Sequence, residues 1–202
     1  MRVVLERFGD AALRARLPDG ADSRSLLDEL RALPYVVDAV VTERHALVAF
    51  DPGHAPVDVA VAIAHALSEP TPATAPGQHR IHVRYDGEDL DEVAAATHLS
   101  RVDVVSLHTA PEYVVAAVGF MPGFAYLRGI DERLFVPRRE RPRPRVAPLS
   151  VAIAGPYTGV YPFASPGGWN LLGVAVGFAP FDATSGATLA LGDRVRFVQV
   201  DP

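Results

Sequence analysis

The run SVAIAGPYTGVYPFASPGGWNLLG, residues 150–173, decides the fold of the larger part of this chain. It consists of short apolar runs separated by glycine and proline, and similar runs lie on both sides of it: YVVAAVGF (113–120), VAIAG (151–155), GVYPF (159–163), WNLLGVAVGF (169–178) and DRVRFVQV (193–200). Many short strands at this spacing are typical of a closed or nearly closed β barrel. The chain has 18 prolines among 202 residues, roughly twice the usual share of about 5%. Much of this barrel domain is therefore predicted to be ordered loop.

The first seventy residues have a different pattern, that of a small α/β unit. Apolar runs predict strands at 3–7 and 12–17, a hairpin from YVVDAVV and ALVAF, and helices at 23–33 and 57–67. Strands with two interspersed helices favour a ferredoxin-like layer with its helices on one face. EPTPATAPGQ, residues 69–78, has three prolines and no periodicity, which indicates a linker. We therefore expect an α+β protein with an N-terminal domain at 1–68 and a barrel domain at 79–202.

The composition excludes several kinds of chemistry. The chain has no cysteine, and all 19 of its basic residues are arginine, so thiolate nucleophiles, Schiff-base lysines and the P-loop lysine are excluded. A formal net charge of -5 argues against a broad nucleic-acid surface. No apolar stretch reaches membrane-spanning length. We expect a cytoplasmic protein that binds neither membrane nor nucleic acid.

DGEDLDEVAAATHLSRVDVVSLHTA, residues 86–110, predicts two short helices. Ser100 and Asp103 form a capping box for the second helix. A helical pair of this kind also resembles a helix-turn-helix DNA reader, in which Arg101 and His108 would face the bases. The second helix otherwise offers mostly Val, Leu and Asp, so packing against the barrel is the favoured interpretation.

Three loop clusters are candidates for the functional site. In the first, Pro122 and Gly123 predict a type II turn that presents Phe120, Phe124 and Tyr126, which either line a ligand slot or plug one end of the barrel. The second, PRRERPRPR, has five arginines in eight residues in an extended form, and guanidinium groups bind carboxylate or phosphate. Its alternatives are a solvated surface and a contact with an acidic partner.

The third cluster is Tyr161-Pro-Phe-Ala-Ser-Pro-Gly-Gly-Trp169. Gly167 and Gly168 allow close backbone approach and could cradle an oxyanion. Ser165 has no His-Asp pair beside it, so a serine hydrolase is not favoured, and Trp169 is expected to be an anchor. His79 and His82 would point to opposite faces of a strand, so no metal site is expected. We expect anion binding by Arg138, Arg143, Arg145, Gly167 and Gly168, in a pocket shaped by Phe120, Phe124, Tyr126, Tyr161, Ser165 and Trp169.

Residues 84–173 resemble the KipI family, also called allophanate hydrolase subunit 1 or carboxyltransferase subdomain C/D, whose bacterial members include the 5-oxoprolinase B subunit (PxpB). The pieces that match, in order, are RYDGEDLDEVAAATHLS, LHTAPEY, GFMPGFAYLRGID, the arginine run, SVAIAG, TGVYP and SPGGWNLLG, with GDRVRF near the end. The resemblance implies a small α/β domain followed by a cyclophilin-like β barrel. It also implies partners: a homologous second subunit (PxpC, or allophanate hydrolase subunit 2) and a third protein, PxpA.

The activity that the resemblance implies is ATP-dependent opening of 5-oxoproline to glutamate by the assembled subunits, with ATP and Mg bound by the complex. The alternatives are a KipI-like regulatory protein that inhibits a sensor histidine kinase by contact, and subunit 1 of an allophanate hydrolase or urea carboxylase type of enzyme. The sequence does not fix the oligomeric state of the isolated chain; a barrel edge that a partner normally covers can pair with a second copy, so edge-to-edge self-association is one expected state. Three positions depart from the family pattern: Tyr157 replaces glutamine, Leu149 ends the Ala-Pro-Leu that replaces Pro-Ala-Gly, and Val174 replaces arginine. These departures predict either another substrate or a subunit that has lost catalysis.

Overall fold

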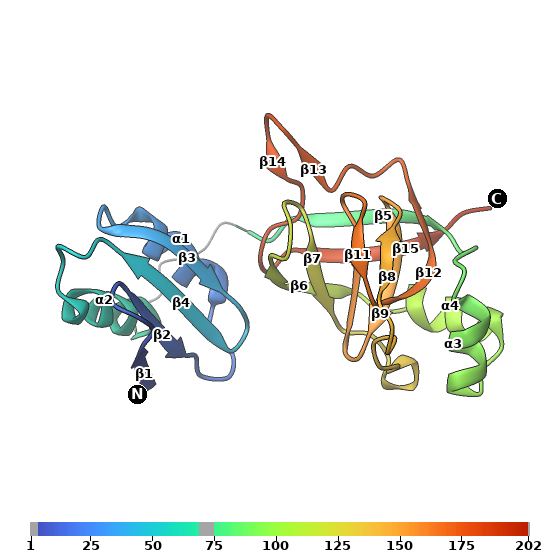
Figure 1. Ribbon diagram of the computed structural model, residues 1–202, viewed down its shortest axis with the longest axis horizontal. Coiled ribbons are helices and arrows are strands. Elements are labelled where there is room, and N and C mark those ends of the chain that lie inside the picture. Colours follow the sequence, from blue (N-terminus) through green and yellow to red (C-terminus); the bar gives the residue numbers. More distant parts are fainter. Residues whose placement is uncertain (1–3, 69–74, 202) are drawn as a thin grey trace. The chain divides into compact units, whose positions relative to one another are not determined.

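A computed structural model of the protein describes residues 4–68 and 75–201. The chain divides into two compact units, one ending at Ala75 and one beginning at Pro76 (Figure 1). Most of the predicted linker, residues 69–74, lies outside the described residues. Its last residues belong to the barrel unit, because the Gly77 amide donates to the carboxylate of Asp193 (2.8 Å) and the first barrel strand begins at Gln78.

The N-terminal unit is one antiparallel sheet with two helices. Its elements are β1 (Val4–Arg7), β2 (Ala12–Arg16), α1 (Ser23–Ala32), β3 (Val36–Val41), β4 (His45–Phe50) and α2 (Pro56–Ser68). The strand order is β1-β2-β4-β3. Strand β4 therefore lies between β2 and β3, which are joined through α1 as in the split βαβ unit of ferredoxin-like folds. The predicted layer is confirmed, although its edge strand β1 comes first in the chain instead of last.

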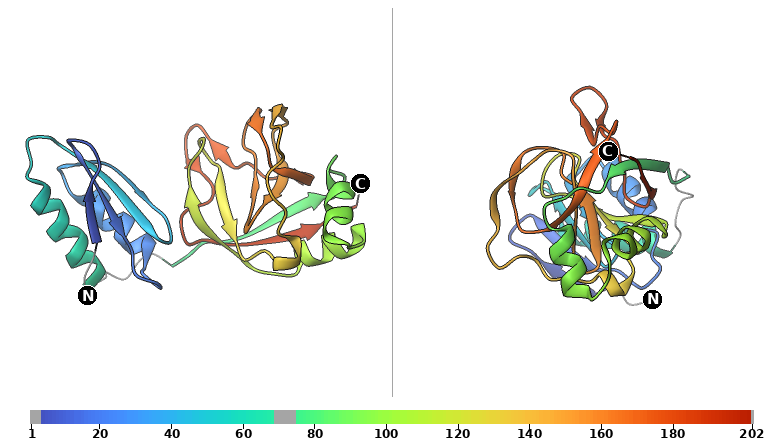
Figure 2. Two further views of the ribbon diagram at one scale, coloured as in Figure 1. Left: turned by 60° about the horizontal axis from the view of Figure 1, so that its bottom comes forward. Right: turned by 90° about the vertical axis from the view of Figure 1, so that its right-hand side faces the viewer.

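An N-terminal cap and side-chain periodicity explain the helices of this unit. The Asp22 carboxylate accepts hydrogen bonds from the amides of Arg24 and Ser25, which begins α1. Leu26 and Leu30, four residues apart on one face, are buried. Helix α2 buries Val59, Ile63 and Ala66 at similar spacing. Both helices contact the sheet and each other, so they cover the same face of it (Figure 2).

The second unit is a closed seven-stranded barrel, as the cyclophilin-like prediction expects. The strand order is β10-β7-β6-β15-β5-β12-β9, closed by the antiparallel pairing of β9 with β10. Strands β15 and β5 are parallel and the other barrel pairs are antiparallel. Closure leaves no free edge among these described strands, which removes the basis of the expected edge-to-edge self-association. The strands are β5 (Gln78–Arg84), β6 (Tyr113–Val118), β7 (Ala125–Arg128), β9 (Ser150–Ala154), β10 (Tyr157–Val160), β12 (Asn170–Val176) and β15 (Arg194–Gln199).

Shorter elements surround the barrel. Two helices and a 3-10 turn contact one another beside the barrel, and two small two-stranded sheets stand apart from the barrel sheet. In one of them β8 pairs with β11, two strands that are not consecutive in the chain, and in the other β13 pairs with β14 as a hairpin. These elements are α3 (Leu90–Thr97), α4 (Arg101–Thr109), η1 (Glu132–Leu134), β8 (Arg143–Val146), β11 (Ser165–Gly167), β13 (Phe181–Asp182) and β14 (Gly186–Ala187).

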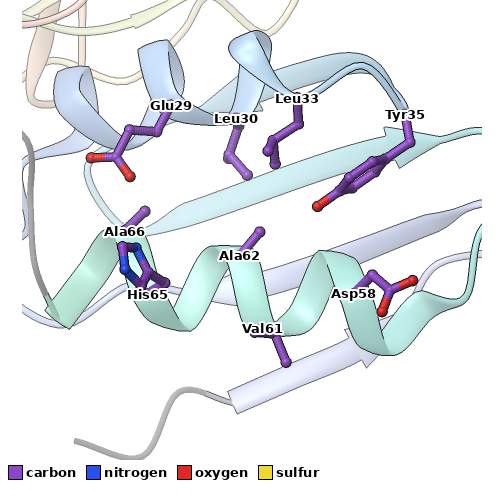
Figure 3. A pocket seen from close by; sticks show the side chains of 9 residues that line it. All are labelled: Glu29, Leu30, Leu33, Tyr35, Asp58, Val61, Ala62, His65 and Ala66. Carbon is purple, nitrogen blue, oxygen red and sulfur yellow. The ribbon is translucent and has the colours of Figure 1, made fainter.

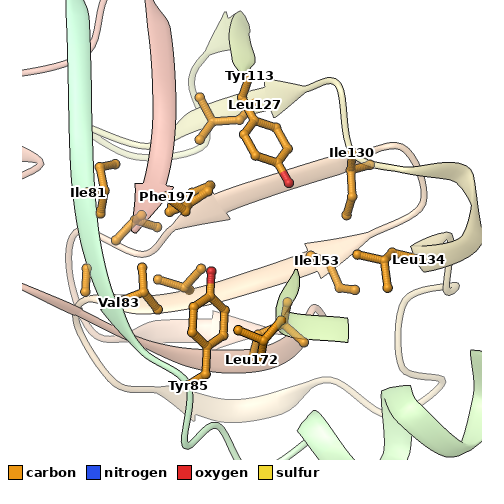
Figure 4. Packing of buried hydrophobic residues seen from close by; sticks show 14 of the residues in the cluster. Ile81, Val83, Tyr85, Tyr113, Leu127, Ile130, Leu134, Ile153, Leu172 and Phe197 are labelled. Atoms are coloured by element: carbon orange, nitrogen blue, oxygen red, sulfur yellow. The ribbon is translucent and has the colours of Figure 1, made fainter. Parts of the chain in front are cut away.

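The barrel interior is filled by side chains that alternate along the strands. Figure 4 shows Ile81 and Phe197, which are paired on neighbouring strands, in one cluster with Leu127 of β7. Ile81, Val83, Val195 and Phe197 are at most 2% exposed, so the residues between them on β5 and β15 face outward. The barrel is thus a packed core without a central channel.

Helices α3 and α4 pack on this core, which confirms the favoured interpretation of the helical pair. Helix α3 contacts β12 and α4 contacts β15. The predicted capping box is present: the Asp103 amide donates to Ser100 Oγ, and the Ser100 amide donates to the Asp103 carboxylate. His108 is 0% exposed and stacks near Phe197. A buried imidazole cannot read base edges, so the helix-turn-helix interpretation is wrong at this residue.

The His108 ring is held by two hydrogen bonds. Thr158 Oγ1 donates to the Ala152 carbonyl (3.0 Å), so it accepts from His108 Nε2 (2.8 Å). His108 Nδ1 then accepts from the Tyr85 hydroxyl (2.7 Å). Burial lowers the pKa of His108 to about 3 and raises the pKa of Tyr85. These two hydrogen bonds join His108 of α4 to Tyr85, which follows β5, and to Thr158 of β10.

Candidate functional site

A buried carboxylate, Asp89, organises the arginine segment 137–145. Asp89 is 2% exposed, and its Oδ1 accepts from Arg139 Nη1 (2.7 Å) and from Arg143 Nη2. Its Oδ2 accepts from the Leu171 amide (2.7 Å), and the Asp89 amide donates to the Leu171 carbonyl (3.1 Å). The carboxylate therefore fixes the arginine segment to the start of α3 and to β12.

Arg143 lies in this ion-pair cluster instead of fanning out into solvent. Its Nε lies 3.2 Å from Glu88 Oε1, and its side chain is 16% exposed. Its remaining nitrogen, Nη1, is buried and has no hydrogen-bond partner. The carboxylates of Asp89 and Glu88 offset the positive charge of Arg143. Its unpartnered Nη1 remains able to donate to a further acceptor.

Arg138 and Arg145 are exposed, and neither has a carboxylate partner among the described residues. Arg138 lines a groove of about 500 Å³ between α3 and the arginine segment, together with Glu92, Val93, Ala96, Val136, Pro137, Arg139, Glu140, Arg141 and Asn170. The structure thus divides the three predicted arginines: Arg143 is partly buried in a salt-bridge cluster, Arg138 faces the groove, and Arg145 faces solvent.

Gly167 packs against the protein's own Tyr161. A Cβ on Gly167 would lie 2.5 Å from the Tyr161 hydroxyl oxygen and 2.9 Å from Val146 Cγ2, whereas the nearest atom to one on Gly168 would be 3.6 Å away. Gly167 pairs with Arg143 across the two-stranded β8–β11 sheet, and the Gly168 carbonyl accepts from the Arg139 amide (2.8 Å). The space beside Gly167 is therefore filled by Tyr161 Oη, and oxyanion binding by this glycine pair stays a prediction.

Tyr161 and Ser165 are two polar side chains at the β8–β11 sheet. Burial raises the pKa of Tyr161, while the Trp169 backbone hydrogen bond and the positive charges of Arg138 and Arg143 oppose the shift. Ser165 Oγ is buried and has no hydrogen-bond partner. Ser165, Gly167 and Arg143 all belong to these two paired strands. The β8–β11 sheet therefore holds two unpartnered buried polar atoms, Ser165 Oγ and Arg143 Nη1.

The aromatic side chains form a second core, and only its rim is exposed. Phe124 is 2% exposed and meets Tyr126, Tyr161 and Trp169 edge to face at ring centroid distances of 5.0, 5.5 and 5.5 Å. Phe120 is 61% exposed, at φ 73°. The turn between them is the predicted one, with Gly123 at φ 81° and the Phe124 amide donating to the Met121 carbonyl. Four of the five predicted aromatic rings pack in this second core, and Phe120 alone is largely exposed.

The three positions that depart from the family pattern lie in different environments. Tyr157 is half-buried, and its ring lies 5.9 Å from that of Tyr126. Leu149 has φ 63°, a conformation that favours glycine. Val174 on β12 is paired with Arg84 on β5. Leu149 therefore keeps the backbone of a glycine position with a larger side chain.

A separate groove of about 450 Å³ lies in the N-terminal unit between α1 and α2. Figure 3 shows Leu30, Leu33 and Ala62 lining it, with acidic side chains near its ends. Its remaining lining residues are Glu29, Tyr35, Asp58, Val61, His65 and Ala66. Within the described ranges, no group of three or more His, Cys, Asp or Glu side chains is placed to hold a metal ion.

Sequence reasoning missed Asp89 and Arg139 as members of the site. Asp89 lies in a stretch that predicts helix and Arg139 in a run that predicts an extended segment, and the two lie 50 residues apart in the sequence. The signal that could have found them is the fixed order of DGEDLDE and the arginine run within the resembling segment.

The fold and this arginine-carboxylate site now have a context in known proteins. The chain matches the family described as "Carboxyltransferase domain, subdomain C and D" over residues 3–188, and it belongs to that family. It is 45% identical over 126 residues to the 5-oxoprolinase B subunit of Bacillus subtilis (strain 168), covering 59% of this chain and 52% of the relative. It is 50% identical over 114 residues to the 5-oxoprolinase B subunit of Escherichia coli O157:H7, covering 55% of this chain and 52% of the relative. The matched part spans about half the length of these relatives.

Solved structures share the whole fold. TTHA0988 has a TM-score of 0.79 and 37% identity, covering 95% of this chain and 40% of that chain. PH0987 from Pyrococcus horikoshii has a TM-score of 0.59 and 32% identity, covering 98% of both chains. Urea carboxylase of Kluyveromyces lactis, at 18% identity and a TM-score of 0.74, shows the fold alone. In the described part of the chain, no helix is long and apolar enough to cross a membrane.

Proposed function

We propose that this chain is the B-type component of a 5-oxoprolinase-like complex and works only with partner subunits. The observation that carries the proposal is its 42–50% identity to three proteins that are each named as the B subunit of 5-oxoprolinase. The proposed partners are a homologous second subunit of the PxpC type and a third protein of the PxpA type. The proposed reaction converts 5-oxoproline, ATP and water into glutamate, ADP and phosphate.

The chemistry requires activation of a lactam. A lactam carbonyl is a poor electrophile, and phosphorylation of its oxygen creates a leaving group before water attacks. The sequence has neither a P-loop nor a lysine, so we assign ATP and Mg to partner residues. This chain then contributes cationic groups that bind and orient anionic parts of the reactants.

Arg138 and Arg145 are the proposed anion-binding groups of this chain. Both are exposed without a carboxylate partner among the described residues, so their guanidinium groups are available to a substrate carboxylate or a phosphoryl oxygen. Asp89 is a proposed positioning residue, because it holds Arg139 and Arg143 at the base of the same segment.

The experiment is turnover by the purified chain with its cognate second and third subunits. ATP hydrolysis that depends on 5-oxoproline is expected for the assembly and not for this chain alone. Arg145→Ala is expected to lower kcat/KM about tenfold, the loss of one charge-assisted contact. Arg101→Ala, an exposed arginine of α4, is the matched control and should leave kcat/KM unchanged. Absence of turnover with all partners present would contradict the proposal.

A second candidate function is KipI-like inhibition of a sensor histidine kinase. The observation that favours it is the change at Tyr157, Leu149 and Val174 within an otherwise matching segment. Autophosphorylation of a sensor histidine kinase from the same organism, measured with and without the purified chain, separates the two functions. Inhibition at stoichiometric concentration without turnover would favour this second function.

A further inference from the structure

A positively charged hollow lies on the outer wall of the barrel, apart from the arginine segment described above. Strands β5 and β15 run parallel and side by side (Figure 1), with Arg196 paired with Arg80 and Arg194 paired with Gln78. All four of these side chains are exposed. A hollow of about 650 Å³ is lined by Gln78, His79, Arg80, Glu112, Arg194 and Arg196.

The charges in this hollow are not balanced by the protein. Arg196 Nε lies 3.3 Å from Glu112 Oε2, while Arg80 and Arg194 have no carboxylate partner among the described residues. Three guanidinium groups therefore share one carboxylate in a chain of net charge -5.

The other nearby acid, Asp193, is buried and bound by main-chain amides and by His79. It is 3% exposed, and its carboxylate accepts from the Gly77 and Ala190 amides and contacts His79 Nε2 (3.0 Å). Like charges on directly paired residues of neighbouring strands destabilise a sheet. An anion held between Arg80 and Arg196 would relieve this repulsion.

The lining also limits what the hollow can recognise. All six lining residues are polar or charged, so an apolar ligand body would find no complementary surface. Guanidinium forks match the oxygens of phosphate and carboxylate groups. We infer that the β5–β15 hollow binds a small polyanion that carries phosphate or several carboxylate groups. This inference does not depend on the proposed enzymatic function.

The test is a titration of the ¹⁵N-labelled full-length chain with sodium pyrophosphate at constant ionic strength. Saturable shifts are expected at the backbone amides of residues 78–80 and 194–196. The Arg80→Gln/Arg194→Gln double variant should raise the Kd at these amides about tenfold or more, because charge-assisted hydrogen bonds are lost. Citrate should compete with pyrophosphate, and acetate should not.

The matched control is the Arg138→Gln/Arg145→Gln double variant, which removes the same charge from two other exposed arginines of the barrel unit. It should leave the Kd at residues 78–80 and 194–196 unchanged. An equal loss in this control would overturn the inference in favour of long-range attraction. Shifts that do not saturate, or saturable binding of a polyglutamate peptide but of neither small anion, would also overturn it. Thermal unfolding of both variants verifies that they are folded.

Discussion

At the scale of single residues, substitution of Gly167 tests how closely the β8–β11 sheet packs against Tyr161. Gly167→Ala is expected to lower the free energy of unfolding by about 1–3 kcal/mol, because the new methyl overpacks a filled space. That methyl would meet the Tyr161 hydroxyl and Val146. The measurement is equilibrium denaturation in urea.

Gly168→Ala is the control for this prediction. Its Cβ would have no neighbour closer than 3.6 Å, so its effect on unfolding should lie within about 0.5 kcal/mol, as for most substitutions that meet no specific feature. Equal destabilisation by the two variants would show that the backbone conformation at residues 167 and 168, and not the contact with Tyr161, sets the requirement for glycine.

His108 makes stability depend on pH. Its folded pKa of about 3 lies below the usual value of 6.5, so below pH 6.5 the unfolded chain gains a proton that the folded protein does not bind. Stability contributed by neutral His108 is therefore complete above pH 6.5 and falls as the pH falls. Between pH 7.5 and pH 5 this loss is about 2 kcal/mol.

The measurement is the unfolding free energy at several pH values for the wild type and His108→Gln. The variant loses hydrogen bonds and is less stable at every pH. Between pH 7.5 and pH 5, however, its unfolding free energy should fall by about 2 kcal/mol less than that of the wild type. His45→Gln, at an exposed histidine, should keep the wild-type slope. A wild-type slope in His108→Gln would mean that His108 does not cause the acid loss.

At the scale of elements, Asp89 joins the arginine segment to α3 and β12. Asp89→Ala is expected to cost about 3 kcal/mol or more of unfolding free energy, because it leaves the partly buried Arg143 with less compensation. Glu92 is an exposed carboxylate that pairs with Arg139, which Asp89 also binds. Glu92→Ala should cost at most about 1 kcal/mol of unfolding free energy. The measurement is the denaturant midpoint of each variant. Equal losses of unfolding free energy would contradict a special role for the buried Asp89 carboxylate.

Local signals predict elements well in this chain, and distant pairings poorly. The Ser100–Asp103 capping box and the Pro122–Gly123 turn depend on residues within four positions, and both are present. The partner of Arg143 is Asp89, 54 residues earlier, and no periodicity carries that information. The sequence therefore predicted only an extended arginine run, while the structure anchors its centre to Asp89.

At the scale of the whole molecule, the two units explain why the fold was more predictable than the site. Strand number, helix positions and the change of pattern near residue 76 are properties of consecutive residues. The candidate site instead combines α3, β8, β11 and the start of β12, which only closure of the barrel brings together. No single motif of the sequence predicted this association.

Barrel closure also predicts that residues 76–202 fold without the N-terminal unit. All seven barrel strands lie between Gln78 and Gln199, and the Arg194 amide is bonded to the Gly77 carbonyl (2.8 Å) within the same unit. The fragment should unfold cooperatively, with a smaller denaturant dependence than the full chain because it exposes less surface. Near-ultraviolet circular dichroism should show the packed Trp169, and the His108-dependent acid loss should persist. A fragment that lacks a cooperative transition would show that the barrel needs the N-terminal unit to fold.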